Sequence, residues 1–350
     1  MKEYLLASLA AVLVCLAIPA AVSHGCEAKE AELPPQTTAE IQTQTVSRAD
    51  AETEPQESQT TTEAQEEQMM SFDETFNLPV LMQSGVDSMS LHDYLVGALS
   101  GEMPLSFDTE ALKAQAVACR TYALRQYAGR KHDPAAVCTV SSCCECWVST
   151  EGIQEEARKR AEQAVSETDG LVLTYDGKLI EATFFSCSGG KTERAADVWG
   201  GELAYLQSVD SPGEEAAPRF LGSVTVSAEQ FCETLLALDE AAEFPPDHGL
   251  WSGEITRTAG GGVGTILLGG RCFTGKQLRK AFGLNSTDFE LAVEDDSVTF
   301  RTRGFGHRVG MSQYGAQAMA QSGADFREIL CHYYTGVAVT DCRELYPNFR

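Results

Sequence analysis

Positive charge is scarce in this sequence. The 350 residues include 26 Lys and Arg against 51 Asp and Glu, which gives a formal net charge of -25. No run of basic residues offsets the excess, so a phosphate backbone would be repelled. We therefore expect no nucleic acid partner.

Aromatic residues are almost missing from a second region, residues 27–75. Between Glu27 and Glu74, thirteen acidic residues stand against two basic ones, and Glu, Thr, Gln and Ala dominate. Such a composition cannot bury enough apolar surface to fold, and its like charges repel one another. We expect an acidic disordered linker over residues 27–75.

Charge of either sign is missing from Tyr4 to Val22. A helix of nineteen residues would reach about 28 Å, just enough to span a bilayer. Pro19 and the small residues after it favour cleavage instead. Residues 1–26 are therefore expected to be a signal peptide or a single membrane anchor, with the anchor favoured, and the remaining chain outside the cytoplasmic membrane. Cleavage and secretion is the alternative.

Internal repeats are also absent, and the elements come in blocks. The patterns predict helices at 109–130, 153–168 and 324–334, a hairpin at 171–185, and strands at 221–226 and 265–268. Ser106 or Asp108 is expected to cap the first helix. Blocks of helices and antiparallel hairpins indicate an α+β fold in one region, residues 76–345. The cysteine-rich loop described next is expected to be stabilised by zinc.

Twelve cysteines in an exported chain would ordinarily indicate disulfides. Four of them, however, crowd into one loop beside a histidine, and zinc takes four nitrogen or sulfur ligands. This density of soft ligands favours a zinc site over local disulfides. The zinc would be structural rather than catalytic, because a fully protein-ligated ion has no open position for a catalytic water. The cluster comprises His132, Cys138, Cys143, Cys144 and Cys146.

Glu102 lies between a glycine and the apolar Met103-Pro104, just ahead of the helix predicted at 109–130. A carboxyl group in apolar surroundings can stay protonated and act as a general acid. An ordinary loop glutamate is the alternative. The surrounding motifs have to decide between the two.

Two glycine-rich segments, 186–192 and 304–316, could line a cleft or form simple turns. The second contains His307, Gln313 and Tyr314, whose side chains suit sugar binding. Cys187 with His307 could in principle form a thiolate pair. We disfavour that pair, because no third residue that would orient the histidine is evident.

These segments together resemble the stage II sporulation protein D family. The resemblance runs in order from about Phe76 to Val339. It is carried by Tyr94 to Pro104, Glu110 to Ala123, Ser188 to Thr192, Val198 to Gly200, Tyr205 to Val209, and Gly306 to Ala316.

The resemblance implies a lytic transglycosylase that cleaves peptidoglycan glycan strands to 1,6-anhydro ends during engulfment of the forespore. It places the catalytic glutamate of the family on Glu102 and its supporting helix residues on Gln115 and Arg120. Ser188, Lys191, His307, Gln313 and Tyr314 would line the cleft, and His132, Cys138, Cys143 and Cys144 would hold zinc.

Three residues depart from the family pattern. Cys143 stands in place of a second histidine ligand, so Cys146 competes for that role. Arg308 stands where glycine is usual, and Phe305 where tryptophan is common. These departures affect the expected shape of the cleft.

Two rival functions remain open. Related domains are known as amidase enhancers, so the chain could bind glycan without cutting it; a zinc or thiol hydrolase would instead depend on Cys143 for activity. The resemblance also implies partners, namely glycan strands, the amidase stage II sporulation protein P, and membrane proteins of the engulfment machinery.

Overall fold

The computed structural model describes residues 71–345. The predicted anchor and residues 27–70 of the predicted linker lie outside this range. Among the described residues, no helix is both long and apolar enough to cross a membrane.

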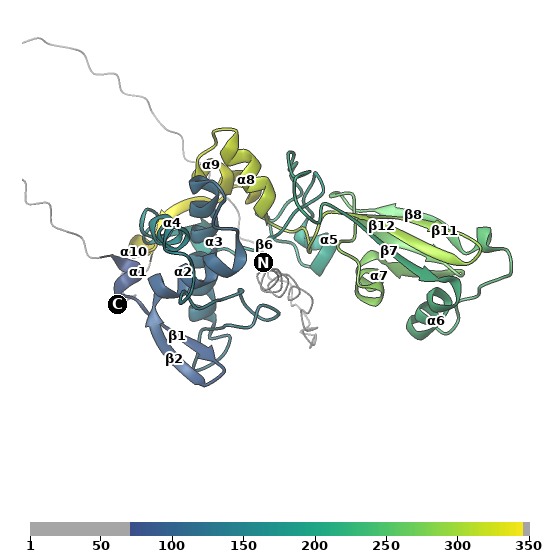
Figure 1. Ribbon diagram of the computed structural model, residues 1–350, viewed down its shortest axis with the longest axis horizontal. Helices are drawn as coiled ribbons and strands as arrows, with labels where there is room; N and C mark the ends of the chain where they lie inside the picture. The colour runs from purple at the N-terminus through teal and green to yellow at the C-terminus, as the bar shows by residue number, and fades with distance from the viewer. Residues whose placement is uncertain (1–70, 346–350) are drawn as a thin grey trace, which may run out of the picture. The chain divides into compact units, whose positions relative to one another are not determined.

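The described chain mixes helices with mostly antiparallel sheets, which confirms the predicted α+β class (Figure 1). The helices are α1 (Phe72–Thr75), α2 (Leu91–Glu102), α3 (Thr109–Gly129), α4 (Glu155–Ser166), α5 (Ala195–Trp199), α6 (Ala228–Leu238), the short 3-10 helix η1 (His248–Leu250), α7 (Gly275–Phe282), α8 (Gln313–Gln321), α9 (Phe326–Tyr333) and α10 (Cys342–Leu345).

The strands are short and form several small sheets. They are β1 (Asn77–Met82), β2 (Gly85–Ser90), β3 (Val137–Cys138), β4 (Leu171–Tyr175), β5 (Lys178–Leu179), β6 (Phe184–Phe185), β7 (Leu221–Ser227), β8 (Ser252–Arg257), β9 (Val263–Leu268), β10 (Arg271–Thr274), β11 (Phe289–Val293), β12 (Ser297–Arg303), β13 (Met311–Ser312) and β14 (Ala338–Asp341).

The larger hydrophobic core forms around α3, which is buried along most of its length. Small residues such as Ala114, Ala116 and Ala118 let neighbouring helices approach closely, so nearly every face of α3 is covered. Asp108 caps the helix by accepting a hydrogen bond from the Glu110 amide, as one of the two predicted caps. The last residue of α2, Glu102, is thereby fixed next to this core.

A separate hydrophobic cluster is built by residues 231–300. Aromatic rings dominate it, with Phe231, Phe273, Phe289 and Phe300 all buried. Two three-stranded antiparallel sheets, β10-β9-β8 and β11-β12-β7, supply most of its residues. Only β7 and β9 of these strands were predicted. The alternation along β12, in which every second residue is buried, was missed.

The hairpin predicted at 171–185 is only partly correct. Its turn and first pairs hold, since Thr174 faces Leu179 and Tyr175 faces Lys178. The following strand β6 leaves the hairpin and pairs in parallel with β13 instead. A distant partner thus takes over the strand, which local turn signals cannot show.

The folded region begins before the predicted boundary at residue 76. Helix α1 spans Phe72–Thr75, and both Phe72 and Asp73 are buried. Asp73 accepts two hydrogen bonds from Arg120 Nε at 2.9 Å and one from Arg120 Nη2 at 2.5 Å. A contact between residues 47 positions apart fixes this segment, so its acidic composition misled the linker prediction.

The Arg120–Asp73 pair has side chains 0% and 1% exposed. Burial raises the pKa of Asp73 even against the opposing charge of Arg120. Such a pair contributes little net stability, yet removing one partner leaves a buried charge unpaired. We expect Asp73→Asn to lower the free energy of unfolding by about 3–5 kcal/mol in urea titrations.

The matched control is Asp239→Asn, which removes a partner of Arg271 at 2.7 Å in an exposed pair. This variant should unfold at nearly the parent urea concentration, because water screens exposed pairs. Equal losses in both variants would show that burial does not set the cost.

Candidate active site and metal centre

Glu102 is the last residue of α2, rather than a loop residue as the sequence suggested. The backbone amide of Cys146 donates a hydrogen bond to its carboxylate Oε1 at 2.5 Å. The side-chain amide of Gln313 donates to its backbone carbonyl at 3.0 Å. Segments 44 and 211 residues away therefore converge on this one residue.

Burial raises the pKa of Glu102 from 4.5 to about 7, while the hydrogen bonds from Cys146 and Gln313 oppose the shift. Desolvation disfavours the charged carboxylate more than these two donors stabilise it. Both protonation states are consequently populated near neutral pH. A group of this kind can give and take a proton within one reaction cycle.

Two glycines of α2 let the 146–147 segment lie directly on the helix. A Cβ at Gly97 would overlap the Trp147 indole, and a Cβ at Gly101 would overlap the Cys146 carbonyl. The two glycines are four residues apart and so share one helix face. This close approach places the Cys146 amide against Glu102.

A second carboxylate, Glu145, lies in the same loop and is 3% exposed. Tyr94 donates a hydrogen bond to its Oε2 at 2.9 Å, while burial and then the charge of Glu102 raise its pKa well above the ordinary value. Sequence reasoning did not single out Glu145 as a carboxylate near Glu102. Because it is fully covered, Glu145 cannot reach a substrate and supports the interior of the site instead.

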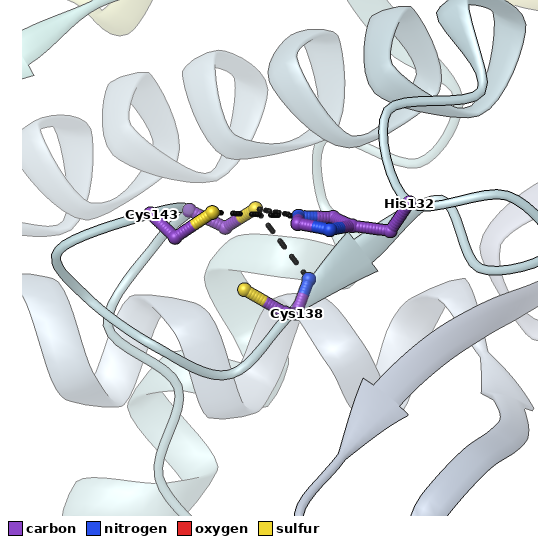
Figure 2. Close-up of side chains that lie close together, drawn as sticks. His132, Cys138 and Cys143 are labelled. Carbon is purple, nitrogen blue, oxygen red and sulfur yellow. Dashed lines mark hydrogen bonds between the residues drawn. The ribbon is translucent and has the colours of Figure 1, made fainter. Parts of the chain in front are cut away.

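The predicted metal ligands His132, Cys138, Cys143 and Cys144 come together (Figure 2). Their donor atoms all lie within 4.8 Å of one another, with His132 Nε2 at 3.3 Å from Cys144 Sγ and 3.5 Å from Cys143 Sγ. Tetrahedral zinc, with bonds of about 2.0–2.3 Å, places its ligand atoms at comparable separations. This cluster could hold a metal ion.

Hydrogen-bond donors surround the cluster. The Cys138 amide donates to Cys144 Sγ at 3.4 Å, and Lys131 Nζ donates to the Cys143 carbonyl at 2.5 Å and to Tyr122 Oη at 3.0 Å. A hydrogen bond from Tyr122 helps to lower the pKa of the Cys144 thiol against its burial. Donors of this kind orient and stabilise thiolate ligands.

The ten cysteines among residues 71–345 are all free, so the alternative of local disulfides is not realised there. Cys146 stays outside the four-residue group and uses its backbone to contact Glu102. The geometry thus favours Cys143 over Cys146 as a metal-ligand candidate.

Arg120 does not occupy the position expected for a support of Glu102. It is fully buried, and besides Asp73 its guanidinium donates to Thr168 and to the carbonyls of Val165 and Leu171. These contacts fasten α1 and α4 to α3. Gln115 is also fully buried, where its Nε2 donates to Cys119 Sγ at 3.3 Å.

Ser188 is likewise buried rather than exposed to a cleft. Its amide and hydroxyl both donate to Glu214 Oε2 at 2.7 Å, and the Gly189 amide donates to the same oxygen at 2.9 Å. Glu214, which the sequence did not single out, therefore organises this loop. Lys191 at the loop's end is 47% exposed and remains accessible.

Two backbone contacts hold the His307 ring. The Val309 amide donates to Nδ1 at 3.1 Å, and the other contact is with the backbone of Phe184. Burial, then the charge of Arg279, lowers its pKa to about 4, so the ring is neutral. Burial also raises the pKa of Cys187 to about 12, which argues against a thiolate pair of these two residues.

Gln313 and Tyr314 begin α8 beside Glu102. The Tyr314 ring packs edge-on against Phe107, with ring centroids 5.1 Å apart. Its side chain stays partly exposed. Gln313 is 7% exposed and mainly positions Glu102.

Arg308 is 1% exposed and has a left-handed backbone, with φ 66°. Its guanidinium donates to Glu193 Oε1 at 3.3 Å and to the carbonyls of Lys191 at 3.0 Å and Gly260 at 2.6 Å. Arg308, which was expected to alter the shape of the cleft, therefore lies in the protein interior. Arg308 ties the loop around Lys191 to the turn at Gly260.

Comparisons with known proteins identify relatives of this chain. Residues 82–175 match the family model described as stage II sporulation protein. The chain is 36% identical to stage II sporulation protein D of Bacillus amyloliquefaciens, over 76% of this chain and 79% of that protein. The Bacillus subtilis (strain 168) protein of that name is also 36% identical, over 73% and 76%. An amidase enhancer of Bacillus subtilis (strain 168) is 27% identical, over 70% of this chain and 40% of its own length.

The donor cluster predicts a metal-dependent stability. The purified chain should carry about one metal ion, and Cys144→Ser should lose it and melt roughly 5 °C or more below the parent, because structural metal binding contributes to folding. Elemental analysis and thermal unfolding measure both effects. Cys331→Ser, at an exposed cysteine outside the cluster, is the control and should match the parent. Parent protein without metal, or unchanged melting of Cys144→Ser, would contradict the assignment.

Proposed function

Because the chain belongs to the stage II sporulation protein D family, we propose that it is a lytic transglycosylase that cleaves the MurNAc-GlcNAc bonds of denuded peptidoglycan strands. The products would carry 1,6-anhydroMurNAc ends, and the reaction would serve forespore engulfment during sporulation. The observation that carries the proposal is the environment of Glu102. Burial raises its pKa to about 7, and Cys146 and Gln313 hold it in place.

The chemistry requires a single residue to act twice. Protonated Glu102 gives its proton to the glycosidic oxygen as the bond from that oxygen to the MurNAc C1 breaks. The 6-hydroxyl oxygen of the same MurNAc then bonds to C1, and its proton returns to the Glu102 carboxylate. No water is consumed, so a second catalytic carboxylate on the opposite face is not needed, unlike in most glycosidases.

Proton transfer depends on the position of the Glu102 carboxyl group. The Cys146 amide holds one carboxylate oxygen and thereby sets the orientation of the group. Lys191 and Tyr314, both at least partly exposed, are proposed to contact the glycan, while Gln313 fixes the helix end. Ser188 and His307 would shape the cleft through their neighbours rather than by direct contact.

Zinc is the ion we propose for the cluster of His132, Cys138, Cys143 and Cys144, since soft thiolate and imidazole donors suit it. When bound, it would supply structural stability to the loop that ends at Cys146. Its role in the reaction would be confined to keeping that loop in place.

The location and partners of the chain follow from the same proposal. We propose a single N-terminal anchor that leaves the catalytic region outside the cytoplasmic membrane, with cleavage and secretion as the alternative. Partners would be the amidase stage II sporulation protein P, which supplies peptide-free strands, and membrane proteins of the engulfment machinery.

A non-catalytic glycan-binding enhancer of a cell-wall amidase is the second candidate function. It is supported by the 27% identity to a protein named amidase enhancer. The two functions differ in their need for a proton donor. An enhancer binds glycan with no bond cleavage, so the carboxyl group of Glu102 should be dispensable to it.

The variant Glu102→Gln separates these functions. It keeps the shape of the side chain but removes the transferable proton, so release of anhydro-muropeptides from denuded glycan should fall by about 10²- to 10⁴-fold. Mass spectrometry of the products measures the loss. Glu151→Gln, at an exposed glutamate, is the control and should cleave like the parent. Full cleavage by Glu102→Gln would sink the proposed mechanism.

The raised pKa of Glu102 predicts the pH profile. The acid form is complete well below pH 7 and is lost as the pH rises through about 7. Accordingly kcat/KM for glycan cleavage should fall on the alkaline side with an apparent pKa near 7. Initial rates between pH 4 and 9 test this. A profile that begins to fall near 4.5, the ordinary value for glutamate, would contradict the burial effect.

A further inference from the structure

Trp199 is the most accessible of the three tryptophans. Its side chain is 37% exposed, whereas Trp251 is 4% exposed and the Trp147 indole lies over Gly97. Indole surface is costly to leave in water, although single exposed apolar residues are common. The setting of Trp199 therefore has to show whether its exposure serves a purpose.

Helix α5 presents the indole from a well-braced turn. Arg194, just before the helix, donates two hydrogen bonds to Asp197 at 2.8 and 3.0 Å. The Ala195 amide donates to the Leu206 carbonyl at 3.1 Å, and Gly200 ends the helix with φ 81°. Little conformational entropy remains to be lost when a ligand settles on the ring.

A row of rings supports the indole. The Trp199 and His307 centroids are 5.3 Å apart, and those of His307 and Phe185 are 5.7 Å apart. Backbone hydrogen bonds hold the His307 ring in place, as described above. The positive charge of Arg279 acts on this ring, so the position suits a neutral ligand better than a cation.

The same row is continuous with the proposed catalytic residue. Phe185 pairs with Ser312 in the parallel β6–β13 ribbon, and the next residue, Gln313, donates to the Glu102 carbonyl. Trp199 and Glu102 are thereby joined through one set of backbone and ring contacts. A glycan strand bound at Glu102 has further sugar units beyond the cleaved bond, and one of these could contact Trp199.

We propose that Trp199 is a substrate-binding residue that stacks its exposed indole face against one sugar ring of the glycan strand. This inference rests on the proposed function, because it names a subsite of the same cleft. A pyranose ring offers a flat face of C–H groups, which an indole covers while the sugar hydroxyls stay in water. Aromatic side chains bind such amphipathic surfaces well.

The test measures binding separately from cleavage. The full chain carrying Glu102→Gln is titrated with a peptide-free GlcNAc-MurNAc tetrasaccharide by calorimetry, alone and with Trp199→Ala or Trp199→Phe. We expect Trp199→Ala to raise Kd by about tenfold or more, and Trp199→Phe by a smaller factor, as aromatic stacking losses do elsewhere. Tyr127→Ala is the matched control, since Tyr127 is also 37% exposed and lies on α3; it should leave Kd unchanged.

Acrylamide quenching of tryptophan fluorescence adds a readout that a structural role would not move. The tetrasaccharide should protect the parent from quenching, and this protection should disappear in Trp199→Phe, while the melting temperature stays within a few degrees of the parent. If Trp199→Ala fails to fold, the Kd of Trp199→Phe and the quenching result decide whether Trp199 contacts the sugar.

The outcomes for the two proposals are distinguishable. Unchanged Kd in folded Trp199 variants, together with lost cleavage in Glu102→Gln, overturns the stacking role alone. Retained cleavage in Glu102→Gln, with glycan binding that still depends on Trp199, overturns the catalytic proposal alone. No measurable binding of the tetrasaccharide by the Glu102→Gln chain with Trp199 intact overturns the inference.

Discussion

The hydrogen bond from the Cys146 amide to the Glu102 carboxylate is the interaction on which the site depends. It exists because Gly97 and Gly101 let the loop lie on α2, and because the preceding residues, up to Cys144, are gathered into a cluster able to hold a metal. Because the donor is a backbone amide, every substitution of Cys146 except proline keeps it. The position of the proposed acid is therefore controlled through the path of the loop.

The burial that raises the pKa of Glu102 has to be maintained without fully closing the site. Glu145 and Tyr94 fill the space beneath the loop with a polar pair that is itself buried, while Gln313 closes the helix end from the other side. A carboxylate in this position is destabilised by lost solvation more than it is stabilised by its donors. The same balance gives a proton that can be donated near neutral pH and recovered afterwards.

The sequence predicted features that depend on local pattern. Helix α3, its Asp108 cap, the turn of the β4–β5 hairpin and the four metal-binding candidates are set by spacing, capping and side-chain chemistry within short segments. It failed where a distant residue decides the outcome. Asp73 was assigned to a linker although Arg120 anchors it, and Ser188 was assigned to a surface although Glu214 buries it. Partner selection across the chain is a tertiary property, and single-sequence patterns carry little information about it.

The two buried arginines show how the chain accommodates residues that a pattern would place at a surface. Arg120 and Arg308 each face a buried carboxylate and also donate to backbone carbonyls, so both guanidinium groups serve as internal braces. Arg308 additionally accepts a left-handed backbone that glycine adopts without strain. The bonds to Lys191 and Gly260 offset that strain only while both segments keep their positions. Arg308 consequently acts as a fixed joint, and it holds the loop that ends at the accessible Lys191 in a single arrangement.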